Sequence, residues 1–552
     1  MSEETSAATP TAPAPGADGD VPDRRFAVAA VDLGATSGRV MLGIVADGRI
    51  ELLPAHRFEN RLVERDGHLC WDMDALWAEI RRGLADAHDL AAARGLGRLA
   101  SIGVDSWAVD YGIVGPDVDG PRRSGASGQA PSGPLGTGRR IGEVIAYRDA
   151  RTDGAADRVS ERIGREQQFA LTGIAQQPFN TLYQLSVDDR LADLPPGSTL
   201  LMVPDLVGSL LTGARRTERT NASSTGMLGL DGRWSTELLE VAGIDPALMA
   251  PLISPGEQLG AVRPELADEL GIGEVPVVAI GSHDTASAVL AVPASPDAHP
   301  VAYISSGTWS LIGLELPAPV ATEEAREAGF TNEAGVDGTV RFLKNVAGMW
   351  LVSESIRQWE EDGARVDLED LLAAAAQAPP NRFRIDPTDE GFLAPGRMAD
   401  RVVAAALPIG GEDPFPGTPA EVVRCILESL AQTYREELHA ACRLAHVPCP
   451  ERLHVVGGGS RNALLNQLTA DALGVEVVAG PTEATALGNV ALQSRTLGAV
   501  PQEPDAIRAL VRASVELERF RPASPLEAPA EGARTPARNL AGRPADARQD
   551  AP

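Results

Sequence analysis

The sequence predicts an α/β protein made of two related domains. Its 552 residues exceed what a single hydrophobic core normally serves. Amphipathic helical segments alternate with valine-rich strands, which is typical of α/β architecture. A strand, a tight turn of small residues and a returning strand occur twice, in residues 26–45 and 301–314. This repetition indicates that the second domain follows the plan of the first.

The helical segments have a regular apolar face. In residues 74–84, Trp77, Ile80 and Leu84 recur at helical spacing after a predicted cap at Asp72. The sequence therefore predicts a helix that packs one side against a sheet.

Composition marks the ends of the two domains. Residues 1–24 and 521–552 are rich in Ala and Pro and are predicted to be disordered tails. The N-terminal domain is expected over residues 25–291 and the C-terminal domain over residues 292–520. The Gly/Ser/Pro-rich residues 115–142 are predicted to form a long exposed loop, for which a plain insertion is the simplest account.

Charge and cysteine content exclude several classes of protein. The net charge of -28 disfavours nucleic acid and anionic membranes as partners. No apolar run reaches the roughly 18 residues of a membrane span. The four cysteines form no CxxC pair, which argues against a zinc site or a disulfide framework and for a reducing cytoplasm.

Both hairpin turns carry residues suited to phosphate. In residues 32–38, glycines, a threonine and a serine can direct backbone N–H groups and hydroxyls at an anion. Asp32 at the start of this turn can hold a magnesium ion through water. An ordinary hairpin with a capping aspartate is the alternative. Residues 305–308 repeat the turn between the second pair of strands.

A third turn contains three glycines. Residues 457–459 stand between a predicted strand and a predicted helix over residues 461–473, with Ser460 as its expected cap. A glycine turn at the start of a helix permits close approach of a nucleotide. A plain connection is the alternative.

A carboxylate base completes the predicted chemistry. Asp284 follows a predicted strand at residues 277–280, while Asp105 and Asp110 compete with it in a strand predicted over residues 103–114. Capping of a helix is the alternative for each aspartate. A base beside a phosphate cradle is the minimum equipment for moving a phosphoryl group onto a hydroxyl. The set therefore predicts a kinase of a small alcohol.

The order of these motifs resembles the FGGY family of sugar kinases. That resemblance implies an actin-like, hexokinase-like fold related to ribonuclease H, with the active site in a cleft between two domains. The similarity extends from about residue 26 to residue 520, and its motifs are specific as a group. It rests on residues 30–42, 147–152, 178–185, 282–289, 305–310, 343–345 and 456–459.

The resemblance also implies roles for single residues. Asp284 matches the proton acceptor of the family. Sugar-contacting positions fall on Ala108, His283, Asp284, Thr285 and Asn345, with Asp105 as a further candidate. Nucleotide-contacting positions fall on Ala35, Thr36, Ser37, Gly38, Arg39, Thr308, Ser353, Gly457, Gly458 and Gly459. Asp32 matches an indirect magnesium ligand.

Some positions depart from the pattern of similar family members. Ala108 stands where a glycine is more frequent, which adds a methyl group beside the sugar. Ser353 stands where a nucleotide-contacting glutamine is expected. Asn381 and Ala399 replace a cysteine pair that some members carry.

The sequences of these motifs are similar to those of family members that act on L-rhamnulose. The resemblance implies transfer of the γ-phosphate of ATP, with Mg²⁺, to the 1-hydroxyl of L-rhamnulose, giving L-rhamnulose 1-phosphate and ADP. Another ketose, such as L-fuculose or xylulose, is one alternative, and a non-catalytic sugar or nucleotide sensor is another. The expected partners are a sugar and a nucleotide, and the chain is expected to be a monomer or a homodimer.

Overall fold

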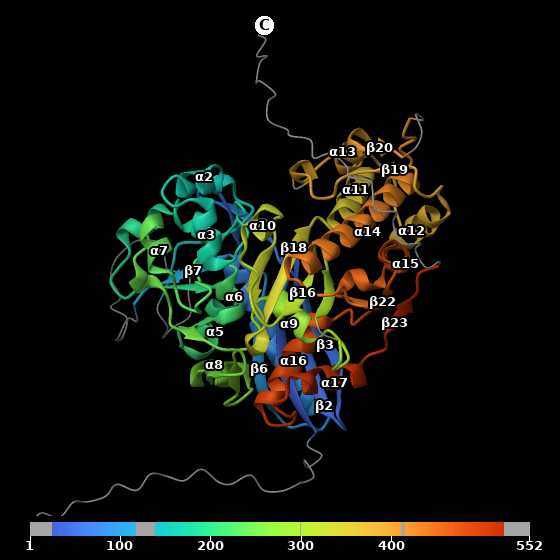
Figure 1. Ribbon diagram of the computed structural model, residues 1–552. Coiled ribbons are helices and arrows are strands. Elements are labelled where there is room, and N and C mark those ends of the chain that lie inside the picture. Colours follow the sequence, from blue (N-terminus) through green and yellow to red (C-terminus); the bar gives the residue numbers. More distant parts are fainter. Residues whose placement is uncertain (1–24, 117–138, 299, 393, 410–413, 524–552) are drawn as a thin grey trace, which may run out of the picture.

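The computed structural model describes residues 25–116, 139–298, 300–392, 394–409 and 414–523. Both predicted tails, apart from a few residues before 524, and residues 117–138 of the predicted loop lie outside these ranges. Within them, two large mixed sheets are covered by helices (Figure 1). No helix in this part of the chain is both long and apolar enough to cross a membrane.

The two sheets share one plan. The first runs in the order β13 (Gln258–Ala261), β14 (Pro276–Val278), β6 (Leu99–Ser106), β1 (Phe26–Leu33), β2 (Ser37–Ala46) and β3 (Arg49–Glu59). The second runs in the order β17 (Thr331–Ala334), β18 (Val340–Val346), β16 (Ser310–Leu316), β15 (Val301–Ser306), β21 (Arg452–Val456), β22 (Glu476–Ala479) and β23 (Glu518–Phe520). β1 pairs antiparallel with β2 and parallel with β6, and β15 pairs antiparallel with β16 and parallel with β21. The predicted internal repeat is therefore confirmed.

Helix α1 (Met73–Ala93) shows how the local pattern builds the first half. Asp72 is its N-cap, and the carboxylate accepts a hydrogen bond from the backbone of Ala75. Trp77, Ile80 and Leu84 are buried, as predicted, in the core between α1 and the first sheet. Helix α5 (Val203–Thr212) contributes to the same core.

Long helices build the second half. α14 (Pro419–Leu444) begins after Thr418, whose side chain caps the helix, and packs beside α15 (Ala463–Leu473) and strand β16. Its apolar residues join those of β15, β16 and β18 in one core.

Two helices join the halves. α9 (Asp284–Leu290) and α16 (Ala484–Thr496) lie together at the centre of the molecule (Figure 1). They approach so closely that a Cβ atom on Gly488 would lie 1.9 Å from the carbonyl oxygen of Ser287, so only glycine fits there. Val28 of the first sheet and Tyr303 of the second belong to one apolar cluster with these helices.

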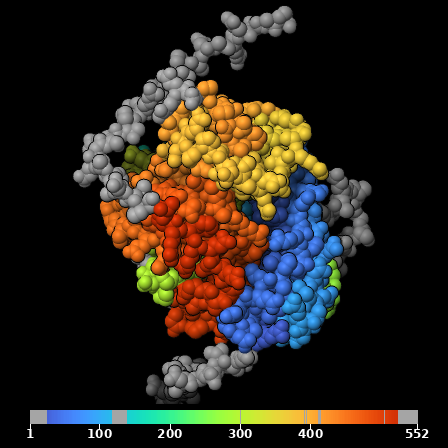
Figure 2. Space-filling model, turned by 90° about the vertical axis from the view of Figure 1, so that its right-hand side faces the viewer, coloured from blue at the N-terminus to red at the C-terminus, as the bar shows by residue number. Residues whose placement is uncertain are grey.

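Two segments near the beginning and the end of the described region also meet. Helix α17 (Pro504–Ser514) packs on β3, and the backbone N–H of Ile50 donates to Ser514 Oγ at 2.8 Å. Figure 2 shows the blue N-terminal part of the chain lying against the red C-terminal part.

The remaining elements are short or peripheral. The other helices are α2 (Ala155–Ser160), α3 (Arg165–Thr172), α4 (Thr181–Leu185), α6 (Arg219–Ser223), α7 (Thr236–Ala242), α8 (Pro264–Leu270), α10 (Glu323–Glu327), α11 (Trp350–Glu361), α12 (Leu368–Gln377) and α13 (Met398–Ala405). The other strands are β4 (Leu62–Arg65), β5 (His68–Trp71), β7 (Tyr111–Val114), β8 (Arg140–Ile141), β9 (Val144–Ile145), β10 (Thr199–Met202), β11 (Thr217–Glu218), β12 (Leu252–Ile253), β19 (Phe383–Arg384) and β20 (Leu407–Pro408).

Two local predictions were wrong. The single strand predicted over residues 103–114 is broken, because Val109 adopts a positive φ of 68° between β6 and β7. Ser460 does not cap α15. Its hydroxyl donates to the carbonyl oxygen of Gly457 within a 3₁₀ turn, and Asn462 caps the helix by accepting from the backbone of Leu465 at 3.0 Å.

Candidate active site

Carboxylates gather at one edge of the first sheet. Asp32 of β1 is the register partner of Asp105 of β6. His283 forms a parallel bridge with Ser106, so Asp284 follows at the same edge. In open α/β sheets, ligands bind at the carboxyl ends of the strands. The structure thus brings together three aspartates that the sequence marks as site residues.

Asp284 is the most accessible of these carboxylates. Its side chain is 32% exposed, whereas Asp32 and Asp105 are buried. Its Oδ1 accepts a hydrogen bond from Thr285 Oγ1 at 3.0 Å and lies 3.4 Å from Nε2 of His283. His283 is the N-cap residue of α9, so the alternative that Asp284 caps this helix is wrong. Its role as the base stays a prediction.

Asp105 has a different environment. Oδ2 accepts from Nδ2 of Asn489 on α16 at 2.6 Å, and Oδ1 has no partner among the described residues. Burial and the neighbouring charge of Asp32 raise the pKa of Asp105 well above its usual value, against the effect of the Asn489 bond. Gln493 extends the chain by donating to Asn489 and accepting from Ser101, each at 2.6 Å. A sugar contact by Asp105 stays a prediction.

The turn that carries Ala108 is fixed by hydrogen bonds to Asp110. The backbone N–H of Asp110 donates to the carbonyl oxygen of Ala108, and Val109 between them has a positive φ. Trp71 and Trp107 donate their indole N–H groups to Oδ2 of Asp110, at 2.6 and 3.0 Å. Burial raises the pKa of Asp110 to about 6, although these bonds lower it. Ala108 itself is partly exposed.

Glu218 holds the segment before Asp284, and the sequence did not identify it. Its buried carboxylate accepts from the backbone N–H and the hydroxyl of Ser282, at 3.0 and 2.9 Å. It also accepts from the backbone of Thr220, whose hydroxyl oxygen accepts from the N–H of His283. These bonds fix the path of the chain into α9.

The second sheet supplies a buried ion pair beside His283. Nη2 of Arg341 lies 3.1 Å from Nδ1 of His283, and Oε2 of Glu333 lies 3.2 Å from the same nitrogen. Burial raises the pKa of Glu333, but the charge of Arg341, together with the neighbouring His283, outweighs burial and holds it at about 2. Asn345 lies on the same face of β18 as Arg341, because side chains alternate along a strand. No sequence pattern pointed to Glu333 or Arg341.

The turn of residues 32–38, which we call the first phosphate turn after its predicted role, is partly open. Ala35 is partly exposed, and Thr36 and Ser37 are exposed. Gly38 is buried, and a Cβ atom there would lie 2.2 Å from the ring of Phe58. The turn therefore presents hydroxyl groups outward, while Gly38 is required for packing.

Charged residues join this turn to the other half. Arg39 donates from Nε and Nη2 to Oδ2 of Asp32, at 2.9 and 2.7 Å, and also pairs with Glu483 ahead of α16. Arg57 lies 3.2 Å from the same glutamate. Burial raises the pKa of Asp32; Arg39 opposes this shift, and the charges of Asp284 and Glu483 add to it.

The second phosphate turn contains no charged residue. The N–H of Gly307 donates to the carbonyl oxygen of Trp309 at 2.8 Å, which closes the turn. The carbonyl oxygen of Thr308 accepts from the N–H of Trp350, the first residue of α11. Ser353 follows on α11 and is exposed. Thr308 and Ser353 therefore lie on adjoining segments.

The three glycines of the third turn have different surroundings. A Cβ atom on Gly457 would lie 2.7 Å from the carbonyl oxygen of Ser306, and one on Gly459 would lie 1.9 Å from Ser306 Oγ. A Cβ atom on Gly458 would have no protein atom within 4 Å. The outer glycines pack against the end of β15, while Gly458 borders open space.

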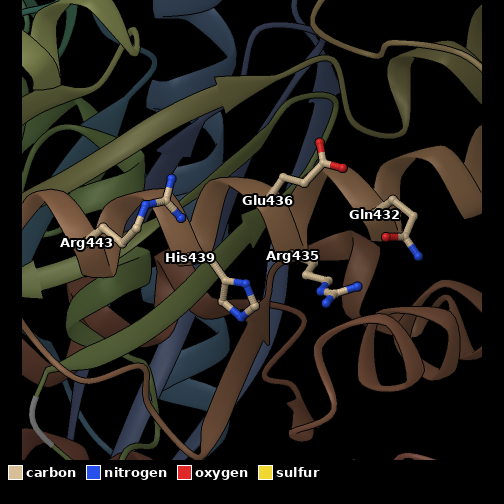
Figure 3. A pocket seen from close by; sticks show the side chains of 5 residues that line it. All are labelled: Gln432, Arg435, Glu436, His439 and Arg443. Carbon is tan, nitrogen blue, oxygen red and sulfur yellow. The ribbon is translucent and has the colours of Figure 1, made fainter. Parts of the chain in front are cut away.

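A separate hollow of about 290 Å³ lies along α14 (Figure 3). It is lined by Gln432, Arg435, Glu436, His439 and Arg443. Burial and the two arginines lower the pKa of His439. None of these residues is a predicted site residue, so this hollow is not the candidate active site.

The fold and the site define a class of protein. Two sheets of one plan, each beginning with a phosphate-type hairpin, meet around carboxylates at strand ends, as in the actin-like and hexokinase-like sugar kinase fold. The N-terminal domain model of the FGGY family of carbohydrate kinases matches residues 136–291, and the C-terminal domain model matches residues 302–497. The chain belongs to the FGGY family of carbohydrate kinases.

Curated relatives are similar over most of their length. A rhamnulokinase from Bacteroides thetaiotaomicron is 40% identical over 496 residues, which cover 89% of this chain and 95% of the relative. A rhamnulokinase from Bacillus subtilis is 37% identical over 494 residues, with coverage of 89% and 95%.

Solved structures share the fold at lower identity. A ligand-bound xylulose kinase from Lactobacillus acidophilus has a TM-score of 0.69 and 16% identity, with 90% of this chain and 94% of that chain covered. A glycerol kinase from Plasmodium falciparum with ADP has a TM-score of 0.69, 15% identity and the same coverage. The predicted family and fold are confirmed.

Proposed function

We propose that this protein transfers the γ-phosphoryl group of ATP to the 1-hydroxyl of L-rhamnulose, giving L-rhamnulose 1-phosphate and ADP. Similarity to rhamnulokinases over 89% of the chain supports the substrate. The observation that carries the chemistry is the partly exposed carboxylate of Asp284 at a sheet edge where the other two aspartates are buried.

Asp284 acts as the base in this reaction. The sugar hydroxyl gives its proton to the carboxylate while its oxygen forms a bond to the γ-phosphorus and the bond to the β-phosphate oxygen breaks. The transition state of phosphoryl transfer is loose, so positioning matters more than a strong base. Ala108, His283, Thr285 and Asn345 hold the sugar in this proposal.

The three turns hold the nucleotide. Thr36 and Ser37 offer exposed hydroxyls, and Arg39 offers a guanidinium that can exchange a carboxylate partner for a phosphate. Gly458 allows the backbone to approach the nucleotide, because no protein atom occupies the space beside it. Thr308 and Ser353 complete this side of the site.

Magnesium suits Asp32 indirectly. No group of three or more His, Cys, Asp or Glu side chains in the described ranges is placed to bind a metal ion. Mg²⁺ commonly keeps several waters and binds through one or two carboxylates and the substrate phosphates. The raised pKa of buried Asp32, to which the charge of Asp284 contributes, fits a position that a cation would stabilise. When bound, the ion would neutralise charge on the phosphates.

A coupled assay of ADP release tests the function. We expect kcat/KM to be highest with L-rhamnulose among L-rhamnulose, L-fuculose and D-xylulose, with little ADP released when no ketose is present. A higher kcat/KM for another ketose would change the substrate. If none of the three ketoses caused release of ADP, the result would favour a sensor. We expect the protein to be a cytoplasmic monomer or homodimer.

A further inference from the structure

The ion pair beside His283 has no role in the sugar and nucleotide contacts assigned above. Arg341 has no exposed surface, and its Nη1 lies 3.0 Å from Oε2 of Glu333. Its Nε donates to the carbonyl oxygen of Ala334 at 3.1 Å. These partners fix the plane of the guanidinium and direct Nη2 at the imidazole of His283.

The contact with Arg341 decides which ring nitrogen of His283 carries the proton. A guanidinium can donate hydrogen bonds but cannot accept them. Oε2 of Glu333 lies 3.2 Å from the same nitrogen but takes part in no hydrogen bond among the described residues. Nδ1, at 3.1 Å from Nη2, therefore accepts from the guanidinium, and the proton of the neutral ring lies on Nε2. Nε2 lies 3.4 Å from Oδ1 of Asp284, so its N–H group faces that oxygen.

The two oxygens of Asp284 are thereby made different. Oδ1 accepts from Thr285 Oγ1 at 3.0 Å and faces Nε2–H of His283. Oδ2 accepts no hydrogen bond from any of the residues that the structure describes. Donors on Oδ1 lower its tendency to take a proton and leave Oδ2 free to meet the sugar hydroxyl.

We propose that Arg341, held by Glu333, is a positioning residue that keeps His283 in its Nε2–H form and makes Oδ2 of Asp284 the oxygen that takes the proton of the sugar. The proton-transfer part rests on the proposed function, whereas the form of His283 does not. Arg341 and Glu333 belong to the second sheet, while Asp284 follows the first. The base is therefore oriented by a contact between the two halves.

Nitrogen NMR of the full chain tests the form of His283 directly. The protein carries eight histidines, and a His283→Gln variant identifies the signals of this ring in ¹⁵N-histidine-labelled protein. We expect an unprotonated Nδ1 and a protonated Nε2. A protonated Nδ1 would overturn the proposal, because it would mean that Glu333 at 3.2 Å is the residue that orients the ring.

An Arg341→Lys variant tests the consequence. Lysine keeps a positive charge beside Glu333 but lacks the fork that reaches three partners. We expect kcat to fall about 10- to 100-fold, as is typical when an outer-shell partner of a site is lost. KM for ATP should stay unchanged, and the His283 signals should become those of a mixture of ring forms. Unchanged kcat with unchanged His283 signals would overturn the proposal.

An Arg508→Lys variant is the matched control. Arg508 pairs with Glu315 of the same sheet, with side-chain exposures of 9% and 12%, and neither is a site residue. We expect its kcat to equal that of the wild type; an equal fall in both variants would mean that loss of any buried pair explains the effect. If the Arg341→Lys variant fails to fold, the wild-type spectrum still shows which ring nitrogen of His283 carries the proton. An Nε2–H ring in a protein that phosphorylates no ketose would refute the proposed function alone.

Discussion

Asp284 and Asp105 look alike in the sequence and differ in the folded protein. Asp105 lies near the end of β6 and Asp284 begins α9 at the same edge of the first sheet, yet the side chain of Asp284 is 32% exposed and Asp105 is fully buried. Asp105 is bound by Asn489 of α16, whereas Asp284 keeps one oxygen free among the described residues. The difference teaches that two aspartates at one edge of a sheet can differ in access to substrate, and this access is why we propose Asp284, and not Asp105, as the base.

The largest effect is expected for Asp284→Asn. Asparagine keeps the size of the side chain, but its amide cannot take a proton from the sugar. A positioned base contributes on the order of 10²–10⁴-fold, so kcat should fall by that factor while sugar and ATP still bind. Steady-state kinetics and calorimetric titration measure the two properties. Loss of sugar binding with unchanged kcat at saturation would assign Asp284 to binding alone.

Asp110 extends the comparison to a third carboxylate, which is buried like that of Asp105. Its pKa is raised to about 6 by burial, above the value of 3.8 expected when unfolded. The folded state therefore holds this proton more tightly, and the resulting stability is present below pH 3.8 and lost as the pH rises through about 6.

An Asp110→Asn variant should lose this dependence. Relative to the variant, the wild type should lose about 2 kcal/mol of unfolding free energy between pH 4 and pH 6, out of roughly 3 kcal/mol for the whole shift at about 1.4 kcal/mol per pKa unit. Denaturant unfolding of both proteins across this range measures the difference. A difference that is constant with pH would contradict the raised pKa.

Gly458→Val should affect only the nucleotide side. A Cβ atom at Gly458 has no protein atom within 4 Å, so a branched side chain would fill the space beside the turn. We expect KM for ATP to rise roughly tenfold or more, about 1.4 kcal/mol, with KM for the sugar little changed. Gly459→Ala is the contrasting variant, because its Cβ atom would collide with Ser306 and lower the melting temperature. A rise in KM for sugar alone would remove this turn from the nucleotide site.

The smallest effect is expected for Asp105→Asn. Because the pKa of Asp105 is raised well above its usual value, its carboxyl group favours the neutral form that asparagine resembles. We expect kcat and the melting temperature to stay within a few-fold and a few degrees of the wild type. A raised KM for sugar would instead support the predicted sugar contact.

Local patterns predicted much of the fold. The two hairpins and the helix after Asp72 follow from strand-like runs, turn residues and helical spacing within short segments. The break at Val109 was missed because valine rarely adopts a positive φ, so nothing in its sequence marks a turn. Ser460 and Asn462 are both suitable cap residues, and the 3₁₀ turn that contains Ser460 leaves the cap position to Asn462.

The site was predicted only in part, for a physical reason. Motif residues such as Asp284 and Gly458 are marked by their neighbours in sequence. Glu218 and Arg341 contact the segment around His283 from 64 and 58 residues away, as hydrogen-bond partners of Ser282 and His283. Burial, which separates Asp105 from Asp284, is likewise a property of the assembled sheets and helices.

A single-turnover experiment tests the assignment of the base most directly. Enzyme in excess over ATP is mixed rapidly with saturating L-rhamnulose, and the reaction is quenched with acid. Each enzyme molecule then turns over at most once, so the experiment measures phosphoryl transfer without a contribution from product release. The Asp284→Asn variant should bind both substrates and show transfer slowed by on the order of 10²–10⁴-fold, while Asp105→Asn should transfer at nearly the wild-type rate. Near-normal transfer by the Asp284 variant, with a dead Asp105 variant, would show that the buried carboxylate is the base and the exposed one is not.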